Sequence, residues 1–279
     1  MQGVRGGDII AALMPRVSVV LSTFDQPNAL GFALTGYRRQ TFRDFEVVVA
    51  DDGSDEVTRA VVEEFRRAGD FPVKHVWQEN RGFRKARIVN RGVLASEGRI
   101  LVLTDGDCIP HSRFLEVHAG HCGENAFCTG GHVMLPADYC RDLDREKVRS
   151  GDYETRMTSA DRWHFRITHW KNLVGIWMGN LRKPKVYGRN ISVDREAFGA
   201  VNGYDNGFDG FGKEDSDLRN RLRRSGVRPV SLWGRAWVYH VDDASDPGIR
   251  QRRIPRGDAS AYYNRPDVPV RCRSGLVEP

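Results

Sequence analysis

At residues 101–110 the chain reads Leu-Val-Leu-Thr-Asp-Gly-Asp-Cys-Ile-Pro, an apolar run followed at once by two carboxylates. The run, which starts at Ile100, is typical of a strand buried in a parallel sheet. Ligands bind at the ends of such strands in open α/β sheets. Asp105 and Asp107, separated by Gly106, are therefore candidates to hold a divalent cation against a phosphate oxygen. The alternative is a turn with two solvated acidic side chains.

Two earlier apolar runs, 17–21 and 45–50, share this β-branched character and also end in polar residues. Helical patterns occupy residues 28–39, 56–68 and 85–95, with Ser54 or Asp55 as candidate cap of the second. Strands that alternate with helices predict a parallel sheet covered on both faces. We therefore expect an α/β fold with a mostly parallel, Rossmann-like central sheet and helices on both faces.

The last third of the chain contains shorter elements. We expect strands at 188–193 and 236–240 and a basic helix at 218–224. From about residue 242 the chain is polar and rich in Pro, Gly and Arg, which predicts a surface tail.

The charge balance is basic, with 43 Lys and Arg against 37 Asp and Glu and a formal net charge of +6. A basic protein can bind nucleic acid, an anionic membrane or a phosphorylated substrate. No nucleic-acid motif is present, so no nucleic-acid partner is expected. The five cysteines form no C-x-x-C pair and fit a reducing compartment. With no apolar window long enough to span a bilayer, we expect a soluble cytoplasmic protein that can contact the inner face of the membrane.

A helical stripe with apolar residues lies in the middle of the chain. It consists of Trp163, Ile167, Trp170, Val174 and Trp177, with basic neighbours. The first interpretation is a helix packed on the core. The second is a face that meets a membrane or an apolar acceptor.

Cations for a phosphate group must come from side chains, because no glycine-rich phosphate loop follows a strand. The segment 80–87 contains Arg81, Arg87 and other basic residues that could supply them, although a solvated basic loop is the alternative. Glu214 and Asp215 follow a glycine-rich loop and open a helix, where they are either a simple helix start or a general base. His240 ends a strand and is either structural or a metal ligand.

These motifs occur in an order that resembles one enzyme family. The chain is similar to inverting glycosyltransferases of the GT-A fold, in family 2, with a C-terminal region of the galactosyltransferase type seen in chondroitin-polymerase-like enzymes. The resemblance covers roughly residues 16–243 and rests on Val17–Phe24, Gln40–Ser54, Asp105-Gly106-Asp107, Gly188–Val193, Asn202–Asp205 and Gly210–Leu218. Phe24-Asp25 stands where the family often has Tyr-Asn, and Phe211 where it usually has Trp.

The resemblance implies roles for individual residues. Nucleotide-binding roles go to Ser22, Thr23, Phe24, Asp52, Arg81, Arg87, Asp105 and Gly106. Asp107, His240 and Asp105 would hold Mn²⁺ or Mg²⁺. Asp215 would be the catalytic base beside Glu214, and the acceptor would contact Glu214, Trp177 and Phe211.

The implied enzyme moves a sugar from a UDP-sugar to an acceptor hydroxyl on a glycan, glycolipid or natural product, with a divalent metal and inversion. The implied domains are an N-terminal extension (1–15), a nucleotide-sugar half (16–135), an acceptor and catalytic half (136–243) and a polar tail (244–279). Two alternatives stay open. A sugar nucleotidyltransferase would also use paired acids but would need a Gly-rich basic loop after the first strand, and a non-catalytic sugar-binding protein would not need both carboxylate sites.

Overall fold

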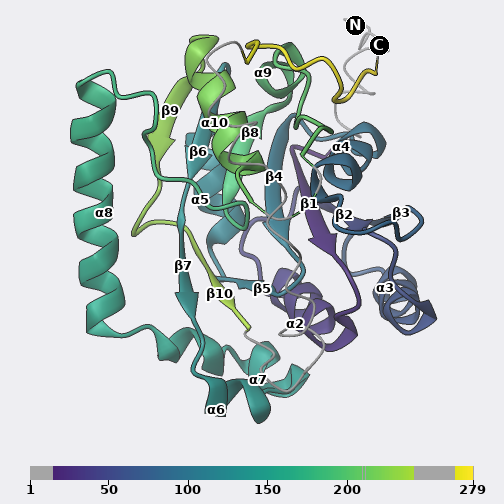
Figure 1. The fold of residues 1–279 in the computed structure, drawn as a ribbon. Helices are drawn as coiled ribbons and strands as arrows, with labels where there is room; N and C mark the ends of the chain where they lie inside the picture. Colours follow the sequence, from purple (N-terminus) through teal and green to yellow (C-terminus); the bar gives the residue numbers. More distant parts are fainter. Residues whose placement is uncertain (1–14, 209, 211, 242–267, 279) are drawn as a thin grey trace, which may run out of the picture.

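The computed structural model describes residues 15–208, 210, 212–241 and 268–278 (Figure 1). Nearly all of the expected N-terminal extension, 1–15, lies outside these residues. Phe211 and most of the expected tail, at 242–267, lie outside them as well.

A seven-stranded sheet runs through the protein in the order β3-β2-β1-β4-β8-β6-β9 (Figure 1). Its strands are β1 (Val17–Thr23), β2 (Phe45–Asp51), β3 (Val73–Trp77), β4 (Ile100–Asp105), β6 (Ala126–Thr129), β8 (Ile191–Asp194) and β9 (Arg228–Ser231). The first four of these strands pair in parallel, whereas β8 is antiparallel to both β4 and β6. The expected mostly parallel sheet is confirmed, and its strand order reverses between β1 and β4, where such sheets bind ligands.

Helices cover both faces of this sheet. One apolar core lies under α2 (Pro27–Arg38), α3 (Glu56–Ala68) and α5 (Phe114–His121). The other lies under α4 (Lys85–Ala95), α9 (Arg195–Ala200) and α10 (Glu214–Arg224). Val19 and Leu21 of β1 belong to the first core and Val20 to the second, as the period-two alternation of a strand requires. The Asp55 side chain caps α3 by accepting from Val57 N and Thr58 N.

A second, three-stranded sheet sits beside the first. Its order is β5-β10-β7, formed by β5 (Cys108–Pro110), β10 (Trp237–His240) and β7 (Gly131–Met134). The antiparallel pairing of β10 with β5 places His240 opposite Cys108. This small sheet therefore brings the end of β10 next to the Asp105-Gly106-Asp107 turn.

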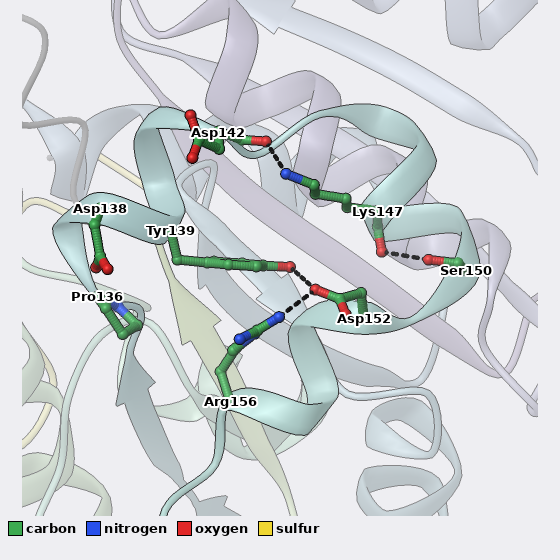
Figure 2. Close-up of a pocket in the computed structure, with 8 residues that line it drawn as sticks. All are labelled: Pro136, Asp138, Tyr139, Asp142, Lys147, Ser150, Asp152 and Arg156. Atoms are coloured by element: carbon green, nitrogen blue, oxygen red, sulfur yellow. Dashed lines mark hydrogen bonds and ion pairs between the residues drawn. The ribbon is translucent and has the colours of Figure 1, made fainter.

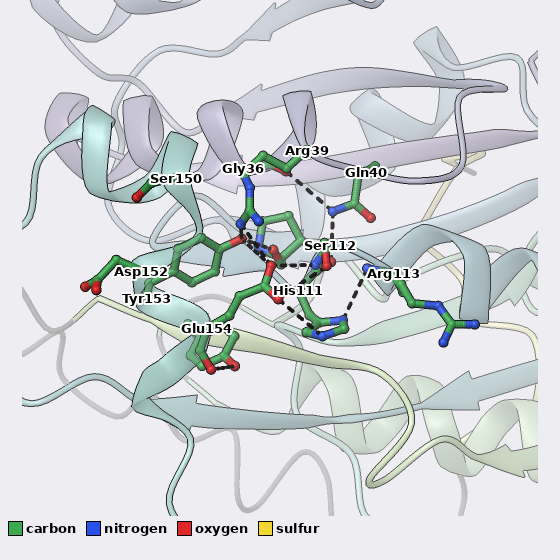
Figure 3. A network of polar contacts seen from close by, with 12 residues as sticks. Gly36, Arg39, Gln40, His111, Ser112, Arg113, Ser150, Asp152, Tyr153 and Glu154 are labelled. Atoms are coloured by element: carbon green, nitrogen blue, oxygen red, sulfur yellow. Dashed lines mark hydrogen bonds and ion pairs between the residues drawn. The ribbon is translucent and has the colours of Figure 1, made fainter.

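The remaining helices surround the small sheet. They are α6 (Ala137–Arg141), α7 (Arg145–Ser150), the 3-10 helix η1 (Asp152–Arg156) and α8 (Ser159–Trp177). Figure 3 shows how η1 is attached to the end of α2 and to the segment after β5. The Glu154 carboxylate accepts from Arg39 Nη1 at 2.9 Å and from Ser112 N at 3.1 Å. The Tyr153 hydroxyl donates to Pro110 O at 2.8 Å, so η1 is tied to both α2 and the end of β5.

The sequence patterns did not indicate β3, β5, β6, β7, β9 or α5. The missed strands are three to five residues long, too short to establish a period. β9 also contains Pro229 and is an edge strand, where proline is tolerated.

The aromatic stripe of α8 faces solvent, so the first interpretation, a stripe packed on the core, is wrong. Trp163 is 63% exposed, Trp170 66% and Trp177 86%. The face that packs inward instead consists of Phe165, Thr168, Asn172 and Gly175. This side of α8 packs against the edge strand β9, where Ser231 Oγ accepts a hydrogen bond from Asn172 Nδ2 at 3.2 Å. A polar residue is therefore buried there in place of a tryptophan.

The described end of the chain, residues 268–278, also differs from the expected surface tail. Cys272 is buried, and Asn202 Nδ2 donates to the carbonyl oxygens of Cys272 and Val277 at 3.0 and 2.9 Å. Arg224 Nη1 donates to Val268 O. This segment therefore packs on the loop that follows α9 and on α10.

Candidate active site

The carboxyl ends of β1, β2 and β4 meet at one edge of the sheet. In the strand register Ser22 lies beside Asp105 of β4, and Thr23 lies beside Asp51 of β2. Ser22 Oγ donates to Asp105 Oδ1 at 2.9 Å, and Gly106 N donates to Ser22 O at 2.7 Å. The carboxyl ends of β1, β2 and β4 thus lie side by side, as the polar residues after these strands predict.

Close approach to β1 explains the glycine between the two aspartates. A Cβ on Gly106 would lie 3.0 Å from both Cβ and Oγ1 of Thr23, tighter than side chains normally pack. Thr23 Oγ1 is buried and has no hydrogen-bond partner among the described residues. Phe24 follows β1 and is half-buried. The Thr23 hydroxyl is therefore available to a ligand at the switch point.

Asp52 is held in place by the segment that leads to α4. Its Oδ1 accepts from Gln78 Nε2 at 2.5 Å and its Oδ2 from Arg84 N at 2.7 Å. Burial raises the pKa of Asp52 even though these donors oppose the shift. Each carboxylate oxygen has a second lone pair, so Asp52 can still accept a hydrogen bond from a nucleoside.

Lys85, the first residue of α4, lies among the acidic residues of the site. Its Nζ is 2.5 Å from Asp105 Oδ1. Burial opposes its charge, but Asp105, Asp215 and Glu214 together raise the pKa of Lys85 above its ordinary value. One ammonium group therefore links the end of β4 to the start of α10.

Arg189 is the second cation at this edge. Its Nε lies 4.0 Å from Asp105 Oδ2, and its carbonyl oxygen accepts from Thr104 Oγ1 at 2.8 Å. Burial opposes the charge, whereas Cys108, Asp105 and Asp107 raise the pKa of Arg189. Lys85 and Arg189 give this edge two fixed positive charges of the kind that bind phosphate.

Asp107 and His240 form a pair. His240 Nε2 is 3.1 Å from Asp107 Oδ2, and the buried His240 Nδ1 has no hydrogen-bond partner among the described residues. Burial acts to raise the pKa of Asp107, but His240, followed by Arg189, lowers it to about 2. An ionised carboxylate beside an imidazole is a donor set that suits Mn²⁺.

The third predicted metal ligand, Asp105, is engaged by Lys85 instead. Within the described part of the chain, no cluster of three His, Cys, Asp or Glu side chains could hold a metal by itself. The residues therefore fit a metal bound by Asp107 and His240, with substrate oxygens and water as the remaining ligands, as is common for ions bound together with a diphosphate.

Glu214 and Asp215 open α10, where the helix N-terminus favours negative charge. Tyr204 donates its hydroxyl to Asp215 Oδ1 at 2.8 Å. A Cβ on Gly188 would lie only 2.4 Å from Asp215 Oδ2, so only glycine fits there. Asp215 is thus packed between a phenol and a backbone segment that fix its orientation.

The two neighbouring acids differ in their environment. Burial, and then the charge of Asp215, raises the pKa of Glu214 to about 7. Burial also raises the pKa of Asp215, but Lys85 and the Tyr204 hydroxyl oppose the shift. Glu214 Oε2 is buried and has no hydrogen-bond partner among the described residues. The pair can thus hold one ionised and one partly protonated carboxyl near neutral pH.

Three other predicted site residues lie elsewhere. Arg81 and Arg87 form surface ion pairs with Glu79 and Glu278. Trp177 ends α8, which packs against β9 at the far edge of the sheet. The structure does not bring these side chains to the strand ends, and the roles given to them stay predictions.

A hollow of about 520 Å³ lies between α6, α7 and η1 (Figure 2). Three of its polar side chains are paired with one another, since Tyr139 and Arg156 both donate to Asp152 Oδ2, at 2.8 and 2.9 Å. None of the predicted site residues lines it. We therefore place the active site at the strand ends.

Two family models match the chain. The model of "Glycosyl transferase family 2" matches residues 18–176, which is more than half of the chain. The chain belongs to glycosyltransferase family 2. A second model, "N-terminal domain of galactosyltransferase", matches residues 158–241, the segment that carries Asp215 and His240. The expected galactosyltransferase-type region of this family 2 protein is therefore confirmed.

Curated relatives of the family 2 protein include a glucosyltransferase and a chondroitin synthase. Validoxylamine A glucosyltransferase of Streptomyces hygroscopicus subsp. jinggangensis is 28% identical over 243 residues, which cover 80% of this chain and 55% of that protein. Chondroitin synthase of Escherichia coli is 24% identical over 240 residues, which cover 81% of this chain and 34% of that protein. The chain thus spans about half or less of the length of these relatives.

Solved structures support the GT-A fold. The mannosyltransferase PcManGT from Pyrobaculum calidifontis, in complex with GDP-Man and Mn²⁺, aligns with a TM-score of 0.57 at 18% identity, over 86% of this chain and 61% of that one. Residues 1–349 of S. aureus TarS, in complex with UDP, align with a TM-score of 0.56 at 16% identity, over 80% of this chain and 60% of that one. At such identity the likeness concerns the fold alone.

Sequence reasoning missed Lys85 and Tyr204 as site residues. Lys85 lies within the basic segment 80–87, but composition alone could not rank its cations. Tyr204 lies in a loop between two helices, and its contact with Asp215 spans 11 residues. A helical start at Lys85 was the available signal, because the first residue of a helix that follows the β3 loop lies near the strand ends.

Proposed function

We propose that this protein transfers a sugar from a UDP-sugar to an acceptor hydroxyl, with inversion at the anomeric carbon and with a divalent metal. The observation that carries the proposal is the position of Lys85. Its ammonium lies 2.5 Å from Asp105 Oδ1, and the charges of Asp105, Asp215 and Glu214 raise its pKa. A donor site at the end of β4 and a base at the start of α10 are thus adjacent. A single displacement needs these two sites and no nucleophilic side chain.

The donor would bind at the switch point between β1 and β4. Asp52 and Thr23 offer an acceptor and an available hydroxyl for the nucleoside, and Phe24 an aromatic ring for the base. Lys85 and Arg189 would bind the diphosphate and stabilise the negative charge that develops on the leaving group. The TarS structure with UDP is consistent with such a donor, whereas that of PcManGT holds GDP-Man.

Asp107 and His240 would hold Mn²⁺ or Mg²⁺. A bound divalent cation would neutralise charge on the leaving diphosphate. Burial alone would favour the neutral acid of Asp107, but His240 and Arg189 lower its pKa. The carboxylate is therefore ionised, as a metal ligand must be.

Asp215 would accept the proton of the attacking acceptor hydroxyl. Tyr204 and Gly188 fix its orientation, and Lys85 favours its ionised form. Glu214, whose pKa is raised to about 7, would hold the acceptor by a hydrogen bond. The base and the leaving group would then lie on opposite sides of the anomeric carbon, which is the condition for inversion.

The sharpest test is Asp215→Asn, with donor turnover measured as UDP release from a panel of UDP-hexoses. Removal of a positioned base typically costs about 10²- to 10⁴-fold in rate. We expect that loss in turnover while UDP affinity by calorimetry changes less than threefold. The wild-type rate should disappear in EDTA and return with Mn²⁺ or Mg²⁺.

Asp70→Asn is the matched control, since Asp70 is exposed and lies before β3, at the opposite end of the parallel strands from the site. Wild-type turnover in the Asp215→Asn variant would contradict the base assignment. Preference for GDP over UDP would contradict the nucleotide assignment. Donor binding without any UDP release would favour a sugar-binding protein, and diphosphate release from a nucleoside triphosphate would favour a nucleotidyltransferase.

We propose a cytoplasmic location on the basis of the thiols. None of the five cysteines forms a disulfide in the structure, and four of them are buried. No helix of the described residues is long and apolar enough to cross a bilayer.

A further inference from the structure

The outer face of α8 carries a line of tryptophans. Trp163, Trp170 and Trp177 are spaced seven residues apart, which is nearly two turns and keeps them on one side of the helix. Ile167, Leu173 and Val174 lie next to this line on the same side, and all but Ile167 are exposed. We call these six residues the aromatic face.

Packing of α8 does not explain the aromatic face. The inward side is formed by Phe165 together with Thr168, Asn172 and Gly175, so apart from Phe165 small and polar residues are buried while tryptophans are exposed. This distribution departs from the usual amphipathic pattern. Soluble monomers rarely expose a contiguous apolar surface of this kind unless it meets another surface. Figure 1 shows α8 at the margin of the molecule, where its outer side is accessible.

The charges around the aromatic face are almost all positive. Residues 159–185 contain six cations, Arg162, Arg166, Lys171, Arg182, Lys183 and Lys185, and one acid, Asp161. Asp161 is engaged in the capping box of α8 with Thr158. Burial and the nearby charges of Lys185, Lys171 and Arg219 lower the pKa of Lys183, as expected for a dense positive cluster.

Four of these cations are exposed: Arg162, Arg166, Lys171 and Arg182. In the described part of the structure none of the four forms a salt bridge. Their charges are therefore available to an external partner.

We propose that the aromatic face docks on a membrane surface that contains anionic lipids. Tryptophan side chains favour the boundary between headgroups and acyl chains, and a helix with aromatic and basic residues lies in that plane. Lysine and arginine at the same depth are attracted to anionic headgroups. The exposed tryptophans and the unpaired cations are both explained by this one partner.

A second copy of the chain fits this surface less well. A symmetric dimer through α8 would place the same surface on both partners, so the cations of one copy would face the cations of the other. Facing cations across such an interface repel each other. An anionic bilayer offers opposite charge and an apolar layer together.

The test is sedimentation of the full chain with vesicles of phosphatidylcholine and phosphatidylglycerol, 3:1, against vesicles of phosphatidylcholine alone. We expect binding to the anionic vesicles only, weaker binding at high salt, and a blue shift of tryptophan emission on binding. The double variant Trp163→Ser/Trp170→Ser should lose at least tenfold in vesicle affinity. The variant Arg162→Gln/Arg166→Gln/Lys171→Gln should lose the preference for anionic lipid.

The control is Val57→Ser/Leu94→Ser, which alters exposed apolar residues on α3 and α4, 59% and 63% exposed. It should bind vesicles like the wild type, and melting temperatures should show that all variants fold. UDP release should be the same in wild type and the double tryptophan variant, which separates membrane docking from catalysis.

Lack of wild-type binding to anionic vesicles would overturn the proposal. So would equal binding to both vesicle types, or unchanged binding of the double tryptophan variant. A concentration-dependent dimer in sedimentation velocity that disappears in that variant, without vesicle binding, would assign the face to self-association instead.

Discussion

Lys85 lies between the end of β4, where we propose that the donor binds, and the start of α10, where we propose the base. Its ammonium lies 2.5 Å from Asp105 Oδ1, and Asp215 and Glu214 also raise its pKa. A diphosphate at the switch point would add negative charge to this group of acids. The site therefore depends on this cation more than on the exposed arginines of the same segment.

We predict that Lys85→Gln weakens UDP binding by about 10- to 100-fold, the value of one or more charge-assisted hydrogen bonds. Calorimetric titration with UDP measures this. Arg81→Gln is the matched control in the same segment, since Arg81 pairs with Glu79 at the surface, and should bind UDP like the wild type. Equal losses in both variants would mean that the whole basic segment, and not Lys85, binds the phosphates.

Tyr204 contacts Asp215, the proposed base, through one hydrogen bond. Its hydroxyl stabilises ionised Asp215, so loss of that bond should raise the pKa of Asp215 further. Because the base must be deprotonated, we predict that Tyr204→Phe moves the acidic limb of the kcat/KM profile to higher pH. The limb reports the coupled Glu214–Asp215 pair.

Tyr239→Phe is the control for this shift, because its hydroxyl donates to Glu154 O, on the 3-10 helix η1. Its pH profile should match the wild type. An unchanged acidic limb in Tyr204→Phe would show that Tyr204 is only structural.

At the scale of the element, α10 is held in position by a buried ion pair. Arg221 is fully buried, its Nε is 2.6 Å from Asp217 Oδ2, and its Nη1 donates to Val201 O and Gly203 O. Those carbonyls belong to the loop that carries Tyr204. The ion pair thus fixes the base and its hydrogen-bond donor relative to each other.

We predict that Arg221→Ala destabilises the protein by about 3–5 kcal/mol, because Asp217 would remain buried without its partner. Urea denaturation measures this loss. Arg59→Ala removes an exposed i,i+3 pair with Glu56 and should cost at most about 0.5 kcal/mol. A loss of similar size in both variants would exclude a special role for the buried pair.

At the scale of the whole molecule, η1 joins the small sheet to the end of α2 and to the segment after β5. Glu154 accepts from Arg39 and Ser112 and lies 3.4 Å from His111 Nε2 (Figure 3). We predict that Glu154→Ala costs about 1–3 kcal/mol, because Arg39 loses its partner in a mostly buried position. The melting temperature should fall by several degrees, whereas Glu63→Ala, at an exposed pair with Arg66, should leave it unchanged. An unchanged melting temperature in Glu154→Ala would show that the other contacts of η1 suffice.

Local sequence determined three neighbouring parallel strands of the sheet, several helices and the acidic residues of the candidate site. Apolar runs at 17–21, 45–50 and 100–104 predicted β1, β2 and β4, because strands buried on both faces are continuously apolar over several residues. Parallel strands end at one edge, so the polar residues that follow them had to meet. Asp105 could be placed at the switch point for the same reason.

Only the tertiary structure decided which neighbours those residues have. The loop between β3 and α4 places Lys85, and not the other cations of segment 80–87, beside Asp105. The packing of α9 and α10 places the Tyr204 hydroxyl beside Asp215. The apolar stripe of α8 was predicted to pack on the core, because helical periodicity shows that a face is apolar but not which surface that face contacts. His240 reached Asp107 through a small sheet whose strands are too short to leave a period in the sequence.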